Sequence, residues 1–432
     1  MAATKTIALP KGTHTVVLGM GDLNGIMRGK RIPASQWENT CKSGNALSLA
    51  LLALDMTCDI WDTPYVSMGN GYPDYHMMPM GEARAIPWEE GVAFCMARGE
   101  GLDHKPVPID PRNCLVRVLD KAKSMGVTVF TGAELEFYLL DRETMAPREK
   151  DIQVYGLARM AELEYILGPI RRNLEAVGIP IEQSNPEYAP GQVEVNIRYG
   201  EALETADRVV AFRALVKELA NREGLHASFM AKPYIDQSGS GFHVHHSLWR
   251  DGKNLFAKDG GLSPLAMNYL AGLQTYMPEM AMAGSTTPNS YRRRQPNTFC
   301  PINTAWGIDN RTVGLRVILG SDSAIRIEKR DGSADCNPYF LLACEIAAGL
   351  KGIEAGLQPT AITTGNAYED ADATPVPRNL ADALALAKSS AFMKEVYGEN
   401  LFAIAASQSE RELAFFANQV TPVETARYLR NF

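Results

Sequence analysis

Two acidic residues interrupt the most strand-like apolar segment of the chain. Glu134 and Glu136 lie in Gly132-Ala-Glu-Leu-Glu-Phe-Tyr-Leu-Leu140, a composition typical of a buried β-strand. Because alternate residues of a strand point to one face, the two carboxylates project together. Unpaired carboxylates in such a place repel each other and lose hydration. The segment therefore predicts a strand whose acids are compensated, and a bound divalent metal is the natural candidate.

A second pair of acids is placed to join them. Glu187 and Glu194 enclose Tyr-Ala-Pro-Gly-Gln-Val, in which Pro190 and Gly191 favour a tight turn. Such a turn folds the two carboxylates back toward one point.

Histidines and one more acid complete the set of candidate ligands. His243 and His245 alternate in a segment that follows a glycine run, and Glu328 alternates with basic residues in Arg326-Ile-Glu-Lys-Arg330. Mostly carboxylate ligation with one histidine suits Mg²⁺ or Mn²⁺ better than structural zinc. A lone glutamate on a strand is ordinarily an edge or salt-bridge residue, but four such segments in one chain favour a metal site.

Composition excludes several classes of protein. A length of 432 residues predicts two domains. The formal net charge of −7 argues against a nucleic-acid binder, and no apolar run approaches the roughly 20 residues that span a bilayer. The seven cysteines form no Cys-x-x-Cys pair, which is typical of reduced thiols. Together with an N-terminus that lacks a secretion signal, these features predict a cytoplasmic protein without membrane or nucleic-acid partners.

The pattern along the chain predicts an α+β or mixed α/β fold. The proline-rich stretch at 105–111 predicts a boundary between a domain of residues 1–107 and one of residues 108–432. Residues 15–20 and 52–61 are expected to be short strands or buried segments, and residues 363–378 a mobile surface loop. Apolar residues at helical spacing predict helices at 112–125, 206–222, 264–280, 339–355 and 380–397.

Arginines accompany the acids. They are Arg292, Arg293, Arg294, Arg311, Arg316, Arg326 and Arg330. Clustered arginines bind carboxylates and phosphates, although a solvated basic face is the simpler interpretation of Arg292 and Arg294. Metal-binding carboxylates with phosphate-binding arginines favour phosphoryl transfer. The chain has no Walker loop, Rossmann glycine fingerprint or Gly-x-Ser-x-Gly elbow.

Six segments in order resemble the glutamine synthetase superfamily of ATP-dependent carboxylate–amine ligases. They are Gly132-Ala-Glu-Leu-Glu-Phe, Glu187 to Glu194, Lys232 to His245, Asn289-Ser-Tyr-Arg-Arg, Asn310 to Arg316, and Arg326 to Tyr339. The resemblance implies a small N-terminal β-grasp domain against a catalytic domain with a curved antiparallel sheet and flanking helices. It also implies a homododecamer of two stacked hexameric rings, with active sites between subunits.

The resemblance also assigns residues. It implies one metal held by Glu136, Glu187 and Glu194 and another by Glu134, His243 and Glu328, with two or three Mg²⁺ or Mn²⁺ ions per site. ATP contacts would come from Glu182, His245, Ser247, Arg311, Arg316 and Arg326, and glutamate contacts from Glu136, Gly239, Arg293 and Arg330. Arg311 would stabilise charge on the transferring phosphoryl group.

One departure from the family concerns the amine. In glutamine synthetases proper, a glutamate six residues after the arginine matching Arg293 helps bind and deprotonate ammonium; here that residue is Phe299, and no glutamate occurs between Glu279 and Glu328. Contact with Phe299 favours an alkylammonium by about 0.8 kcal/mol per buried CH₂, and Phe299 or Trp306 could attract its charge. The alternative is that Phe299 packs inside its loop.

Other departures concern residues near the substrates. Ser238 replaces an asparagine that is frequent in the family. We assign the acceptor of the amine proton to Asp62, with Asp59 and Asp74 as alternatives. Tyr368 lies where some members are adenylylated, but its neighbours differ and we expect no such regulation.

These observations predict a ligase that joins glutamate and methylamine to γ-glutamylmethylamide through a γ-glutamyl phosphate, at the cost of ATP. The alternative amines are ammonia, ethanolamine, isopropylamine and a polyamine. A catalytically silent scaffold is the hypothesis from another class, and the presence of all six expected metal ligands argues against it.

Overall fold

The N-terminal part of the chain forms a five-stranded sheet. The computed structural model describes residues 6–432. The strands are β1 (Thr15–Gly21), β2 (Met27–Pro33), β3 (Asn45–Ser48), β4 (Asp74–Ala85) and β5 (Val92–Glu100). Their order is β2-β1-β5-β4-β3, with β1 and β5 parallel and the other pairs antiparallel. Helix α1 (Trp37–Ser43) lies against β4, so this part has the predicted β-grasp character.

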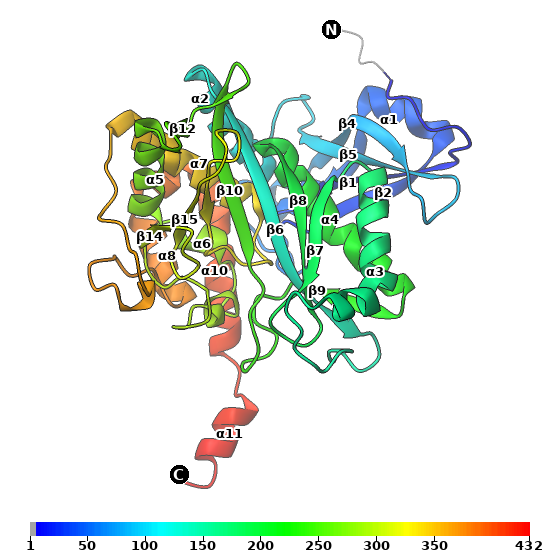
Figure 1. Cartoon of the computed structure of the whole chain (residues 1–432). Coiled ribbons are helices and arrows are strands. Elements are labelled where there is room, and N and C mark those ends of the chain that lie inside the picture. Colours follow the sequence, from blue (N-terminus) through cyan, green and yellow to red (C-terminus); the bar gives the residue numbers. More distant parts are fainter. Residues whose placement is uncertain (1–5) are drawn as a thin grey trace.

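A larger curved sheet forms the centre of the molecule (Figure 1). Its order is β14-β15-β16-β10-β6-β8-β7, while β9 pairs with β6 and β11 pairs with β10. All pairs are antiparallel, as predicted, except the parallel pair β14–β15. The strands are β6 (Thr128–Asp141), β7 (Ile181–Pro186), β8 (Gln192–Glu201), β9 (Leu225–Ser228), β10 (Phe242–Arg250), β11 (Lys253–Asn254), β14 (Trp306–Ile308), β15 (Leu315–Ile318) and β16 (Arg326–Lys329); β12 (Ala257–Lys258) and β13 (Gly261–Leu262) form a separate hairpin.

Ten helices belong to this part of the chain, and all but the last flank the sheet (Figure 1). They are α2 (Pro111–Ser124), α3 (Leu157–Ala176), α4 (Ala202–Arg222), α5 (Pro264–Tyr276), α6 (Ala281–Gly284), α7 (Pro338–Ala355), α8 (Leu380–Ser389), α9 (Ala391–Tyr397), α10 (Glu399–Ala417) and α11 (Pro422–Tyr428). Four begin with a polar cap followed by proline, namely Asp110, Ser263, Asn337 and Thr421 before α2, α5, α7 and α11. Four of the five predicted helices are confirmed. The fifth, at 380–397, is two helices, because the Ser390 hydroxyl accepts from the Met393 amide and caps α9.

Residues 101–110 connect β5 to α2, where the sequence predicts a domain boundary. The hydrophobic core nevertheless continues across this connection. Gly21 of β1, for example, leaves room for Tyr339 of α7, whose ring carbon would lie 2.9 Å from a Cβ at that position. The division into domains 1–107 and 108–432 therefore stays a prediction.

Two irregular regions differ in how they are held. The second expected buried segment, residues 52–61, is only partly as predicted: Leu52 and Ala53 end a buried 3₁₀ helix, η2 (Leu49–Ala53), and Trp61 is buried, but residues 57–60 are exposed. The 363–378 segment is irregular, as predicted, but it is anchored at Ala367, which is fully buried. At the other end of the chain, α11 has no buried residue and projects away from the body (Figure 1).

Among residues 6–432, no helix is long and apolar enough to cross a membrane. All seven cysteines lie in this part of the chain and are free thiols.

Candidate active site

The strand register gathers the acidic residues. It places three pairs opposite each other: Glu134 with His243, Glu136 with Glu194, and His245 with Glu328. Glu187 joins them from the turn between β7 and β8, where its amide donates to the Gln192 carbonyl at 2.8 Å. Gly191 takes a left-handed φ of 71° in that turn, so the sequence predicted the hairpin and its cause.

Two groups of these side chains are close enough to share an ion. Glu134, Glu194 and His243 form one group, and Glu134, His245 and Glu328 form the other, with ligand atoms within 4.8 Å of one another in each. His245 Nε2 lies 2.8 Å from one Glu134 oxygen, and His243 Nδ1 lies 3.3 Å from the other. The family resemblance groups the ligands differently and gives His245 to ATP. The assignment of ligands to individual metals therefore stays a prediction.

The electrostatics of the acids calls for a cation. Burial, followed by the charge of Glu136, raises the pKa of Glu187 to about 7. Burial and the charges of Glu134, Glu136 and Glu187 raise the pKa of Glu194 to about 9. Without another positive charge these carboxyl groups retain protons near neutral pH. An oxygen-rich set of this kind fits Mg²⁺ or Mn²⁺.

Glu328 and Glu134 already have positive partners. Glu328 is fully buried, yet its pKa is lowered because Arg330 and the site histidines outweigh the cost of burial. Arg330 Nη1 lies 2.5 Å from one of its oxygens and Arg316 Nη1 lies 3.0 Å from the other. Against the cost of burial, His245 and His243 likewise hold the pKa of Glu134 well below its usual range.

Two cavities open on either side of these ligands. The first, of about 380 Å³, contains Glu136, Glu187, His243, Gly239, Arg293, Arg330 and Phe299 in its lining. The second, of about 470 Å³, contains Glu134, Glu182, His245, Ser247 and Arg326, with the aromatic residues Phe130, Tyr199 and Trp249. The residues expected to bind glutamate thus line the first cavity, and four of the six expected to bind ATP line the second. Glu134 and Glu136, neighbours on one strand face, separate the two.

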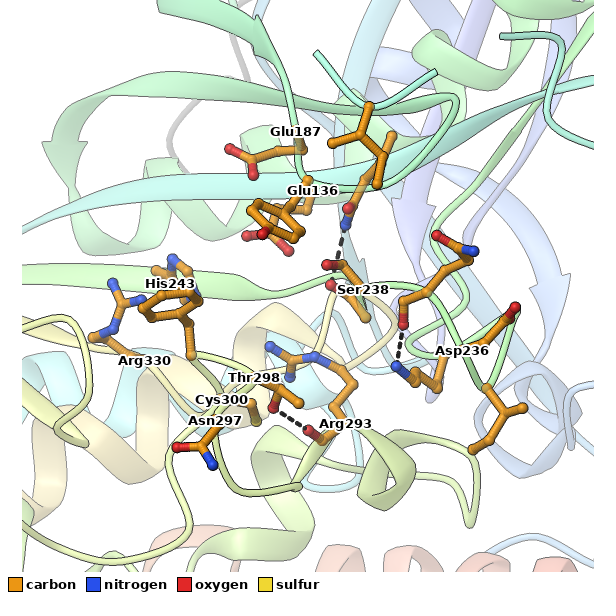
Figure 2. Close-up of a pocket in the computed structure, with 18 residues that line it drawn as sticks. Glu136, Glu187, Asp236, Ser238, His243, Arg293, Asn297, Thr298, Cys300 and Arg330 are labelled. Carbon is orange, nitrogen blue, oxygen red and sulfur yellow. Dashed lines mark hydrogen bonds between the residues drawn. The ribbon is translucent and has the colours of Figure 1, made fainter. Parts of the chain in front are cut away.

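Figure 2 shows the first cavity. Glu136 and Glu187 lie on one side, and Arg293 with Thr298 and Cys300 on the other. Arg293 is buried and donates from Nη1 to the Gly332 carbonyl at 2.8 Å. Its guanidinium is therefore held in place before any substrate binds.

Five expected site residues line neither cavity, namely the candidate metal ligands Glu194 and Glu328 together with Arg311, Arg316 and Asp62. Arg316 pairs with Glu328 and Asp309, and Arg311 is exposed in the turn between β14 and β15. Asp62 is exposed before β4, where it accepts from the Tyr72 hydroxyl at 2.6 Å, a bond that lowers its pKa. Their catalytic roles stay predictions.

Among the alternatives for the proton acceptor, Asp59 is paired with Arg411 at 2.7 Å. That ion pair makes Asp59 a weaker candidate than Asp62. Asp74 is exposed at the start of β4.

Two sequence expectations are wrong. Arg294 is 1 % exposed rather than solvated, and it donates to the Pro377 carbonyl at 3.0 Å and contacts Asp331; Arg292 is exposed, as expected. Trp306 lies in the core, donates to the Thr360 carbonyl, and does not line the first cavity. Phe299 is thus the better candidate for the amine's aromatic neighbour.

Sequence reasoning missed several residues that shape the site. Gln192 is buried and donates to the Gly239 carbonyl at 3.0 Å, and Asn185 donates to Glu187 at 3.0 Å. The period-two pattern of Gln192, Glu194 and Asn196 could have revealed the first. Ile152 and Ile235 of the first cavity come from irregular segments and carry no such signal.

Comparison with known proteins agrees with this geometry. The family model for the catalytic domain of glutamine synthetase matches residues 108–428. The chain belongs to the glutamine synthetase family. It is therefore an ATP-dependent carbon–nitrogen ligase, of a family that uses divalent metals with ATP.

Individual relatives act on different amines. The chain is 32% identical to a glutamate–isopropylamine ligase of a Pseudomonas species, covering 96% of this chain and 95% of the relative. It is 35% identical to a γ-glutamylethanolamide synthetase of Streptomyces coelicolor, covering 96% and 92%. A solved structure, a GmaS/ADP complex, superposes with a TM-score of 0.86 at 29% identity over 97% of both chains. The overall fold is that of this structure.

Replacing Glu194 with glutamine tests the charge balance. In chelator at pH 8, we expect Glu194→Gln to raise the melting temperature by roughly 2–4 °C, because the folded wild type must keep a proton on Glu194 that the unfolded chain has released. Saturating Mg²⁺ should raise the melting temperature of the wild type and raise that of the variant less. Differential scanning fluorimetry measures both.

The matched control is Glu90→Gln, at an exposed position outside the cavities. It should leave both melting temperatures unchanged. A Glu194→Gln protein that melts lower than wild type in chelator would contradict the proposed repulsion.

Proposed function

We propose that the protein joins the γ-carboxyl group of glutamate to methylamine, converting ATP to ADP and phosphate and forming γ-glutamylmethylamide. The observation that carries this proposal is the position of Phe299, whose side chain is 56 % exposed yet lines the first cavity with Glu136, Arg293 and Arg330. Phe299 therefore does not pack inside its loop. It faces the space next to the residues expected to hold glutamate.

The same cavity offers further apolar surface. Ile152 and Ile235 line it and are 50 % and 73 % exposed. A methyl group that covers part of such a surface gains about 0.8 kcal/mol, whereas ammonium gains nothing from it. The carboxylates of Glu136 and Glu187 supply negative charge to the ammonium end of either amine.

The chemistry follows from the two cavities. Glutamate in the first cavity would direct its γ-carboxylate, between Glu134 and Glu136, at the terminal phosphate of ATP in the second. Attack forms γ-glutamyl phosphate and ADP. Divalent metal held by the site glutamates and His243 would neutralise phosphate charge.

Arg293 and Arg330 are fixed by bonds to protein groups, so they would hold glutamate without reorganising. The amine then loses a proton and attacks the acyl carbon, and phosphate leaves. We assign the proton to Asp62 of a neighbouring copy, because Asp62 of the same chain lines neither cavity.

The comparisons support an alkylamine as the class of substrate. The GmaS neighbour is a γ-glutamylmethylamide synthetase, and the relatives named for isopropylamine and ethanolamine make those amines the main alternatives.

A panel of amines tests the proposal. With glutamate, ATP and Mg²⁺, phosphate release should show a higher kcat/KM for methylamine than for ammonium, ethanolamine or isopropylamine. Phe299→Glu should move the preference toward ammonium by roughly tenfold, because a carboxylate replaces apolar surface. A wild-type preference for ammonium would refute the choice of methylamine, and an unchanged preference in the variant would show that Phe299 does not meet the amine.

We also propose that the chain assembles into the double hexameric ring of its family. Supporting this, the C-terminal arm, residues 418–432, projects from the body and exposes apolar side chains. Val423, Leu429 and Phe432 are 75 %, 74 % and 102 % exposed. Exposed apolar groups of this kind are typical of an interface.

Light scattering tests the assembly and the part played by the arm. We expect a dodecamer for the wild type and a smaller particle for Leu429→Asp, because the variant places a charge in an apolar contact. Asn431→Asp adds the same charge at an exposed polar position and should leave the mass unchanged. A monomeric wild type would contradict the ring, and a dodecameric Leu429→Asp would contradict the role of the arm.

A further inference from the structure

The backbone that carries Phe299 has an unfavourable conformation. Phe299 takes a φ of 57° and Asn297 a φ of 62°. Left-handed backbone is uncommon for residues with a Cβ and is unusual for a bulky aromatic one. Such a conformation persists only when the surrounding structure holds it.

Within residues 6–432, one side-chain hydrogen bond joins residues 297–300 to a distant part of the chain. Within the segment, Thr298 Oγ1 donates to the Gln295 carbonyl at 2.7 Å. The Tyr368 hydroxyl donates to the Cys300 carbonyl at 3.1 Å, across 68 residues of chain. Cys300 is buried, so this bond fixes the backbone directly after Phe299.

Tyr368 is itself held firmly. It lies in the 3₁₀ helix η5 (Ala367–Glu369), whose first residue is fully buried. Asn303 donates to the Ala367 carbonyl at 2.7 Å, and the Ala367 amide donates to Thr312 Oγ1 at 3.0 Å. Burial raises the pKa of Tyr368 to about 12, so its hydroxyl carries the proton that it donates at neutral pH.

We propose that Tyr368 is a positioning residue for amine selection: its bond to the Cys300 carbonyl keeps Phe299 in the left-handed conformation that turns the ring toward the first cavity. This inference rests on the proposed function, in which Phe299 meets the amine. Tyr368 lines neither cavity, so it acts through Phe299 and not on the substrate.

Tyr368→Phe removes only the hydroxyl and tests the proposal. Loss of one neutral hydrogen bond should lower kcat/KM for methylamine about three- to tenfold, mainly through a higher KM for the amine. The kcat/KM for ammonium should fall less, and the KM values for ATP and glutamate should not change. An equal loss for both amines, or no loss, would overturn the inference.

A double variant, Tyr368→Phe in Phe299→Ala protein, tests this inference separately from the proposed function. In Phe299→Ala protein, adding Tyr368→Phe should leave the methylamine-to-ammonium ratio unchanged, because the ring to be positioned is gone. If Phe299→Ala alone does not alter the ratio, the proposed role of Phe299 fails. If it does alter the ratio and Tyr368→Phe does not, only the positioning role fails.

Two further variants complete the experiment. Thr275→Val is the matched control, because it removes a hydroxyl-to-carbonyl bond of 2.8 Å, to Ala271 within α5, away from both cavities, and it should keep the wild-type ratio. Thr312→Val removes the partner of the Ala367 amide and should shift the ratio in the same direction as Tyr368→Phe. An unchanged ratio in Thr312→Val would contradict the anchoring described above.

Discussion

Repulsion between buried carboxylates is the constraint on which the site depends. The register of strands β8, β6, β10 and β16 brings glutamates of three strands together on one face: Glu194 of β8, Glu134 and Glu136 of β6, and Glu328 of β16. A structure of this kind is costly unless positive charge is supplied. The protein supplies part of it through Arg330, Arg316 and the histidines. Further positive charge would come from the divalent metal that the family uses with ATP, and it would relieve the repulsion between these carboxylates.

The opposite face of these strands solves a related problem differently. Lys329, next to Glu328, is 1 % exposed and lies 3.1 Å from Glu345 of α7. His246, next to His245, contacts the other Glu345 oxygen at 2.9 Å. Here Lys329 has acidic partners from within the chain, and breaking such a buried pair costs about 3–5 kcal/mol. On the face away from the site, the charges of Lys329 and Glu345 neutralise each other within the chain. On the face of the site, neutralising the carboxylates would also require bound cations.

Regular alternation made much of this predictable from sequence. The strand carrying Glu134 and Glu136 and the turn between Glu187 and Glu194 follow from local patterns, because a strand has a period of two and Pro190-Gly191 favours a turn. The family resemblance carried by six ordered motifs then predicted the fold. The arrangement of the two cavities depends on the register between neighbouring strands. The pattern within a single strand does not predict that register.

What sequence could not supply lies outside regular structure. Arg294 looked like its solvated neighbour Arg292, because a 3₁₀ turn, η4 (Ser290–Arg293), and the chain after it have no simple period that separates buried from exposed. Ile152 and Ile235 come from loops that meet only in three dimensions. The left-handed φ of Phe299 is likewise set by contacts from residues far along the chain, and no propensity of phenylalanine indicates it.

This division between strands and loops separates the two halves of the chemistry. The residues expected to serve phosphoryl transfer lie mainly on hydrogen-bonded strands, where a change in one side chain disturbs the charge balance of its neighbours. The residues proposed to face the amine lie on segments 142–156, 233–238 and 297–300, outside the strands of the sheet. Substitution there can change the amine while leaving the ligase chemistry intact. Relatives that share about a third of the sequence yet are named for isopropylamine or ethanolamine are what such a division allows. On this proposal, amine choice depends both on which residues these loops carry and on how the fold holds each loop.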